Sequence, residues 1–151
     1  MGSIVSYQKS TDQYTTYTLR EPDDMQDNTP RCTELCTLGD ITYVYIPDGV
    51  VLPEQPEQIA ASVHVVELTP DLRDRIKLAS PHVALISRRM VETIRSIYSI
   101  DDEMYFARIG VGAATGMYVP EPGEMDEMAQ FGSFVEGVRQ WGRDERAKLG
   151  L

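Results

Sequence analysis

The feature that most constrains this chain is a change of character near Thr69. Before this residue the sequence is acidic and rich in proline, tyrosine and threonine, and its apolar residues come in short alternating runs. After it, apolar residues recur every three or four positions behind helix-capping residues, as in amphipathic helices. We therefore expect an α+β fold, with a β-rich or extended region over residues 1–68. Three or four helices should follow over residues 69–151, the whole forming one compact unit with an arm.

The charge of the chain is concentrated in its first region. Of the net charge of −10, residues 1–69 carry −8, from 11 acidic and 3 basic side chains. Nucleic-acid affinity comes largely from lysine and arginine neutralising phosphates, so we expect no direct binding of nucleic acid. The acidity fits solubility, a basic protein partner, or imitation of a nucleic acid.

Strand signals cluster in the first region. The composition of residues 7–20 favours extended structure, and Ile41, Tyr43 and Tyr45 alternate with Thr42 and Val44 in the clearest strand of the chain. A hairpin turn at residues 48–49 would join this strand to a short one over residues 50–52. Prolines then indicate a linker to a third short strand within residues 62–68.

Helix signals fill the second region. Thr69 followed by proline predicts a helix to Ala79, and Ser80 followed by proline predicts a longer one behind it. Ser99 with Asp102 predicts the cap of a third helix, which should end or loosen at the glycines of residues 110–116. A last helix is expected after residue 122. Three glycines inside it indicate either close approach of another backbone or a break: Gly132, Gly137 and Gly142.

No catalytic or metal-binding constellation stands out. Cys32 and Cys36 are not spaced like a thioredoxin-type pair, and the only two histidines lie too far apart for a typical zinc site. The acids at residues 101–103 and 124–127 are ordinary for the first turn of a helix. Residues 110–116 follow no strand and precede no phosphate-binding lysine. We expect no enzymatic activity, no metal and no cofactor.

The sequence carries no sign of export or of membrane insertion. Its first ten residues lack the basic and apolar regions of a signal peptide, and no apolar run reaches the length of a membrane span. We expect a soluble protein that is not secreted by a signal peptide and has no membrane partner. MGSIVS formally matches the N-myristoylation pattern, which is short and often met by chance.

Residues 80–151 resemble the C-terminal regions of small accessory proteins of tailed bacteriophages. The resemblance rests on Arg95 with Tyr98 and Ser99, on the Asp-Asp-Glu opening of the next helix, and on the closing stretch from Val138 to Arg143 around Trp141. Such proteins are encoded among tail and tail-fibre genes and include fibre-assembly chaperones and small virion components. The resemblance implies a place in the virion or the host cytoplasm.

We therefore expect a non-enzymatic structural or assembly protein of the phage tail or virion. Its partners would be other virion or tail proteins and further copies of itself. The alternative is a small acidic inhibitor of a host nucleic-acid-binding enzyme, with one negative surface formed by Asp23, Asp24, Asp27, Glu54 and Glu57. The predicted contact residues are Tyr43 and Tyr45 in the strand region and Phe131, Phe134, Val138 and Trp141 in the last helix; a core role is an equally good interpretation of each.

Overall fold

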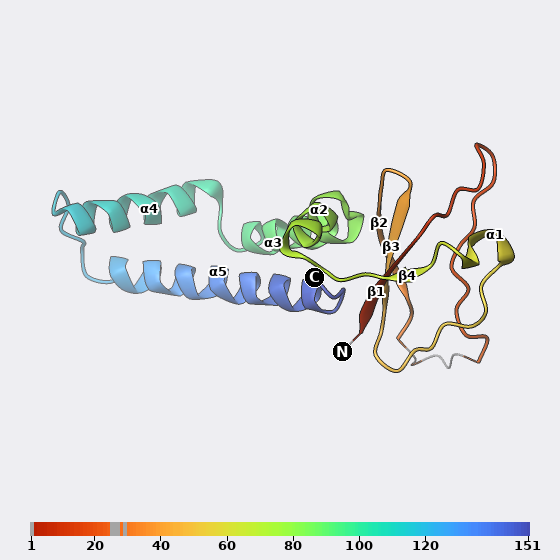
Figure 1. Cartoon of the computed structure of the whole chain (residues 1–151). Helices are drawn as coiled ribbons and strands as arrows, with labels where there is room; N and C mark the ends of the chain where they lie inside the picture. The colour runs from red at the N-terminus through yellow and green to blue at the C-terminus, as the bar shows by residue number, and fades with distance from the viewer. Residues whose placement is uncertain (1, 25–27, 29) are drawn as a thin grey trace. The chain divides into compact units, whose positions relative to one another are not determined.

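A small antiparallel sheet followed by helices gives the protein the expected α+β fold (Figure 1). The computed structural model describes residues 2–24, 28 and 30–151. Within them the sheet has the order β2-β3-β1-β4, made of β1 (Ser3–Tyr7), β2 (Thr33–Leu38), β3 (Ile41–Ile46) and β4 (His64–Val65). The helices are α1 (Glu57–Ala60), α2 (Pro70–Ala79), α3 (Pro81–Arg95), α4 (Ile100–Thr115) and α5 (Glu124–Ala147).

The chain divides into two compact units. The sheet unit comprises Met1–Ala84 together with Arg146–Leu151, and the helical unit comprises Leu85–Glu145. The boundaries fall inside α3 and α5 rather than at residue 69. The reason is that α2, although helical, packs on β2 and so belongs to the sheet unit.

The sheet is covered by apolar side chains on both faces, because neighbouring residues of a strand point to opposite sides. On one face the buried residues are Val5, Tyr7, Leu19, Val44, Ile46 and Ile59. On the other they are Ile4, Leu35, Cys36 and Ile76, with Tyr43, Tyr45, Leu149 and Leu151 packed against them. Residues 146–151 therefore complete the core of the sheet unit.

A β-bulge in β2 explains how two neighbouring residues share one face. Glu34 pairs with Val44 and Cys36 pairs with Tyr43, which leaves Leu35 as the extra residue. A bulge places successive side chains on the same side of the sheet. Leu35 and Cys36 are accordingly both buried in the cluster that receives α2.

The expected hairpin at residues 48–49 is wrong. β3 pairs with β2 and β1, and β2 joins it through Gly39 and Asp40, with φ of +60° at Gly39. A two-residue loop with positive φ at its first position is the type II′ pattern, which matches strand twist. Residues 47–50 form a turn instead, in which the Val50 amide donates to the Pro47 carbonyl over 3.2 Å, and residues 50–56 are not in a strand.

The other strand predictions hold in part. β1 covers Ser3–Tyr7, so the strand ends where the extended segment was expected to begin, and residues 8–20 contain only an isolated bridge between Ser10 and Thr16. The predicted third strand is confirmed as the short β4. The expected linker before it holds the single turn of α1, which the sequence pattern did not predict.

Two of the three predicted helix caps are confirmed. Thr69 accepts a hydrogen bond from the Leu72 amide over 3.2 Å, and Ser99 forms a complete capping box with Asp102. The helix expected after Ser80 is present as α3, but the buried Ser80 hydroxyl has no hydrogen-bond partner.

The glycine predictions hold in part. α4 runs through Gly110 and Gly112 and ends at Gly116, which has the left-handed φ of +73° common after a last helical turn. α5 is one unbroken helix of 24 residues. At Gly142 an added Cβ would collide with the Met90 side chain, so close approach explains this glycine, although the neighbour is a side chain rather than a backbone.

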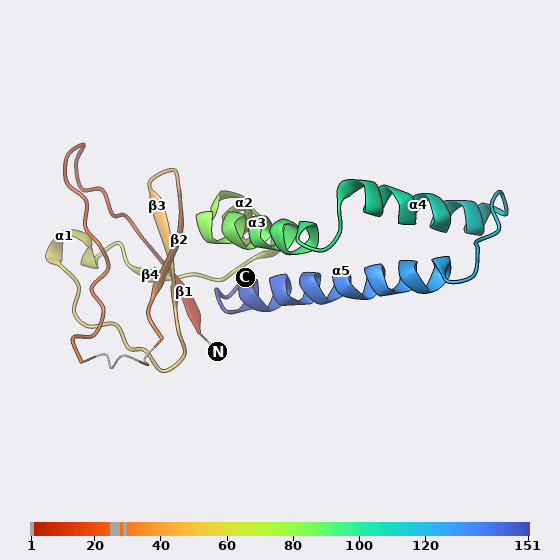
Figure 2. The same ribbon diagram turned by 180° about the vertical axis from the view of Figure 1, so that it is seen from behind.

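The helical unit has two layers. α5 forms one layer, and α3 from Leu85 onward and α4 lie in series along it as the other (Figures 1 and 2). α4 runs antiparallel to the first half of α5, and Phe106 of α4 stacks on Phe131 of α5. The end of α3 lies along the second half, where Met90 meets Gly142.

Candidate interaction surfaces

An aromatic cluster joins α5 to α4 and to the turn before it. The rings of Tyr98 and Phe131 pack edge-to-face at a centroid distance of 4.9 Å, and the centroid of the Tyr98 ring lies 5.6 Å from that of Phe134. Phe106 stacks on Phe131 at 5.0 Å. Offset and edge-to-face pairs of this kind add to the stabilisation from burial alone. Phe131 therefore contributes to the internal packing of the helical unit.

Beside this cluster lies an open groove between α3 and α5. It is a cavity of about 410 Å³ lined by Thr93, Ser133, Phe134, Gly137, Val138 and Trp141. Val138 forms its buried floor, whereas Phe134 and Trp141 are half-buried. Three of the four predicted helical contact residues thus meet at one groove, and Phe131 lies in the adjoining aromatic cluster.

The predicted strand contact residues lie in a different environment. Tyr43 and Tyr45 are half-buried on β3 and pack against the cluster of Ile4, Leu35, Cys36 and Ile76. In the described structure they support the sheet face that α2 and residues 149–151 cover.

A buried carboxylate closes the turn between α4 and α5. Glu124 is only 9% exposed, and its Oε1 accepts hydrogen bonds from the Tyr118 hydroxyl and the Glu121 amide, both over 2.6 Å. The Tyr105 hydroxyl donates to its Oε2 over 2.8 Å. The bonds from Tyr118, Glu121 and Tyr105 lower the pKa of Glu124, and the same carboxylate raises the pKa of Tyr118 to about 12.

Sequence reasoning missed the role of Glu124, which it grouped with Asp126 and Glu127 as an ordinary first-turn acid. Its bonding partners come from residue 105 and from the turn after α4, and no local pattern links these positions. The side chains of Tyr105, Tyr118 and Glu124 line a shallow cavity of about 470 Å³, together with Arg108 and Ile109. Because Glu124 is held by three donors of its own chain, we interpret it as a clamp on the turn.

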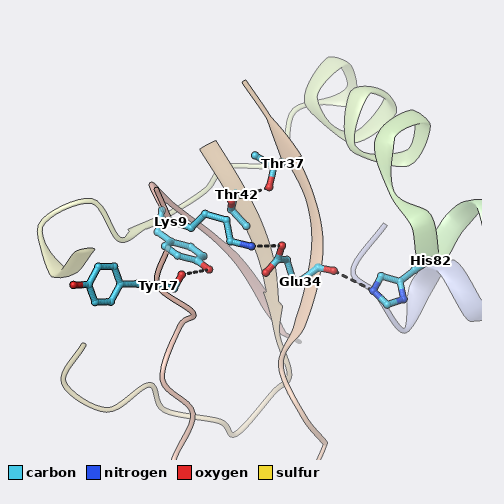
Figure 3. A network of polar contacts seen from close by, with 7 residues as sticks. Lys9, Tyr17, Glu34, Thr37, Thr42 and His82 are labelled. Carbon is cyan, nitrogen blue, oxygen red and sulfur yellow. Dashed lines mark hydrogen bonds and ion pairs between the residues drawn. The ribbon is translucent and has the colours of Figure 1, made fainter. Parts of the chain in front are cut away.

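A network of polar contacts ties the sheet to its neighbouring segments (Figure 3). Lys9 donates to the Glu34 carboxylate over 2.7 Å, and the Glu34 carbonyl lies 3.1 Å from Nε2 of His82 at the start of α3. The Tyr7 hydroxyl donates to the Tyr17 carbonyl over 3.2 Å, and burial raises the pKa of Tyr7. The polar groups of these residues form hydrogen bonds with one another, which indicates a structural role.

Cys32 and Cys36, which were considered for metal or redox chemistry, pack in different apolar clusters of the sheet unit. Cys36 is buried and Cys32 half-buried, and both are free thiols. Burial, with Glu21 close by, raises the pKa of Cys32 to about 11, which disfavours the reactive thiolate. Among residues 2–24, 28 and 30–151, no three His, Cys, Asp or Glu side chains are grouped as a metal ion would need.

The described helices also include none with the length and apolar character needed to cross a lipid bilayer. Comparison with known proteins found no match among family models, curated proteins or solved structures.

Proposed function

We propose that this chain is a non-enzymatic structural or assembly protein that acts through protein–protein contacts. The observation that carries the proposal is the groove between α3 and α5, in which Phe134 and Trp141 remain half-buried. Half-exposed aromatic side chains around an apolar hollow are typical of interface centres.

The resemblance of residues 80–151 to accessory proteins of tailed phages narrows this proposal. It favours a tail- or virion-associated protein that is found in the particle or in the cytoplasm of the infected host. Its partners would then be other tail or virion proteins and further copies of the chain. The groove lies within residues 80–151, the part of the chain that carries the resemblance. The resemblance therefore supports the groove as the contact site.

The test uses a glycine that faces the groove. Gly137 lines the groove and has open space where a Cβ would stand, so Gly137→Gln should fill the groove without disturbing α5. Gly132→Gln is the matched control, since Gly132 is equally open but does not line the groove. Tagged chains are captured from cells infected with the phage that encodes them, and the bound proteins are identified by mass spectrometry.

We expect the unsubstituted chain and Gly132→Gln to retain the same virion or tail proteins, and Gly137→Gln to lose them. Capture that is unchanged by Gly137→Gln would show that the groove is not the contact site. Capture of no virion protein by any of the three chains would contradict the phage assignment itself.

One observation favours a second candidate, the acidic inhibitor. Gln55 accepts a hydrogen bond from the Arg20 amide over 2.7 Å and donates to the Arg20 carbonyl over 2.9 Å, so two acidic segments lie next to each other. Their exposed carboxylates are Asp23, Asp24, Glu54 and Glu57. Asp27, the fifth residue expected there, lies outside the described residues. This function predicts capture of a host nucleic-acid enzyme, lost steeply as salt is raised.

A further inference from the structure

The helical unit leaves many apolar side chains uncovered. In a two-layer arrangement each helix buries one side only, and few residues of this unit are fully enclosed. Along one side of α4 a shallow hollow of about 440 Å³ is lined almost wholly by small and apolar groups around Met104, Val111 and Met117. The large apolar residues that the unit leaves more than half exposed include Ile97, Met104, Val111, Met117 and Val119. The hollow on α4 and the groove between α3 and α5 are therefore places where this unit offers apolar surface to a partner.

The charge of the helical unit is divided unevenly along its length. The turn half, residues 96–135, contains the α4–α5 turn and carries seven acids and one arginine, a net charge of −6. The open half, residues 85–95 with 136–145, carries four acids and five arginines, a net charge of +1. The groove between α3 and α5 lies mainly in the open half.

We propose that two copies of the chain associate through their helical units in antiparallel orientation, the turn half of each lying on the open half of the other. This inference rests on the proposed function and names a second copy as the partner. Charge decides the orientation: a parallel pair would place two halves of net charge −6 against each other, whereas the antiparallel pair places each against a half of +1.

The shapes of the two halves support the same pairing. At the turn, Met117 is 88% and Val119 is 85% exposed, so these apolar side chains project into solvent. The open half offers most of the apolar groove, including Gly137, Val138 and Trp141, and Phe134 lines it from the adjoining end of the turn half. In the antiparallel pair the projecting turn of each copy fills the groove of the other.

A two-fold axis would make both contacts at once and leave neither half unpaired. Such an interface is self-complementary and closes at the dimer. Along α5 the groove residue Gly137 and the first residue, Glu124, are separated by about 20 Å at a rise of about 1.5 Å per residue. The overlap is long enough for the exposed side of α4 to share in the buried surface.

The first experiment measures the mass of the full chain in solution. Sedimentation equilibrium over a range of concentrations should show a monomer–dimer equilibrium. Met117→Asp and Val119→Asp place a charge on side chains that the monomer leaves exposed, so the fold should be retained. Each should weaken the dimer by roughly tenfold or more, as expected for loss of a central apolar contact. Val51→Asp, at a residue 81% exposed in the sheet unit, is the matched control and should leave the dimer unchanged.

The second experiment tests the orientation. A copy with Met117→Cys is mixed under mild oxidation with a copy of different mass that carries Gly137→Cys. Because a disulfide needs Cα atoms within about 7 Å, only antiparallel docking of turn into groove should give the mixed covalent dimer. The unsubstituted chain, which keeps the half-buried Cys32 and the buried Cys36, is the blank.

A covalent dimer of Met117→Cys with itself would overturn the antiparallel arrangement, as would open-ended oligomers. A monomer at all concentrations would overturn the second copy as partner. If that monomer still captured virion proteins, and lost them with Met117→Asp, the apolar surface would be the binding site for another protein rather than for a second copy. The proposed assembly function would then stand while this inference failed.

Discussion

Tyr118 and Glu124 hold the α4–α5 turn closed through a hydrogen bond of 2.6 Å from the tyrosine hydroxyl to Oε1. The bond raises the pKa of Tyr118 from 10.0 to about 12 and lowers the pKa of Glu124 from 4.5. The bond contributes its full stabilisation between pH 4.5 and pH 10.0, the ordinary pKa values of the two groups. The stabilisation is lost as the pH rises through the folded pKa of Tyr118, or falls through that of Glu124.

Removing the Tyr118 hydroxyl should reduce the alkaline sensitivity of the protein. The unsubstituted chain should lose stability between about pH 10 and about pH 12, because the unfolded state releases the Tyr118 proton first. Tyr118→Phe should be less stable near neutral pH and should lose less between these two values. Thermal unfolding followed by circular dichroism measures both effects. Tyr14→Phe, at a residue 87% exposed, serves as control, and equal slopes in the two variants would contradict the prediction.

Ile76 should be the residue of α2 most sensitive to truncation. It is completely buried against Leu35 and Cys36, so Ile76→Ala should cost about 2–5 kcal/mol of unfolding free energy. Leu78 stands two residues further on the same helix and is 91% exposed, and Leu78→Ala should change stability by less than about 0.5 kcal/mol. Urea unfolding compares the two. Similar losses would show that α2 does not pack on the sheet as described.

The two serines that precede helices should respond in opposite ways to alanine. Ser99 makes the capping box of α4 with Asp102, and Ser99→Ala should cost about 1 kcal/mol. The hydroxyl of Ser80 is buried without a partner, so Ser80→Ala should be neutral or should stabilise by up to about 1 kcal/mol. Urea midpoints give both values, and a clear loss with Ser80→Ala would mean that the hydroxyl has a partner.

The glycines of α5 should separate into two kinds. Gly132→Ala should stabilise the helix by about 0.5–1 kcal/mol, since nothing lies near the added methyl group. Gly142→Ala should lose most of that gain, because the methyl group meets the end of the Met90 side chain, which must then move. In a Met90→Ala background Gly142→Ala should regain it. An equal gain at both glycines in the unsubstituted chain would show that Met90 and Gly142 do not touch.

Local signals predicted most of the helical part of the fold. A cap such as Thr69 needs only the amide of Leu72, three residues away, so the start of α2 can be deduced from neighbouring residues alone. The same holds for Ser99 and Asp102. Of the glycines expected to end or loosen α4, Gly110 and Gly112 lie inside the helix, because the cost of glycine in a helix is small and tertiary packing outweighs it. Only the left-handed position, Gly116, ends the helix.

Strand pairing was harder to predict because a strand carries no signal that names its partner. Gly39-Asp40 and Asp48-Gly49 are similar turn signals on either side of β3, and only the first joins two strands. The sequence predicted three of the residues that line the groove, Phe134, Val138 and Trp141, because helical periodicity puts them on one side of α5. Its opposite wall, at Thr93 of α3, depends on how the helices pack, which periodicity does not determine.

The return of Leu149 and Leu151 to the sheet has a consequence for synthesis of the protein. A ribosome releases residues 1–84 well before residues 146–151, so the cluster around Ile4 and Leu35 waits with one side uncovered while the whole helical unit emerges. Contacts between such distant parts of a chain form slowly. Until residues 146–151 have emerged, the core of the sheet unit cannot be completed, because Leu149 and Leu151 are still missing from it.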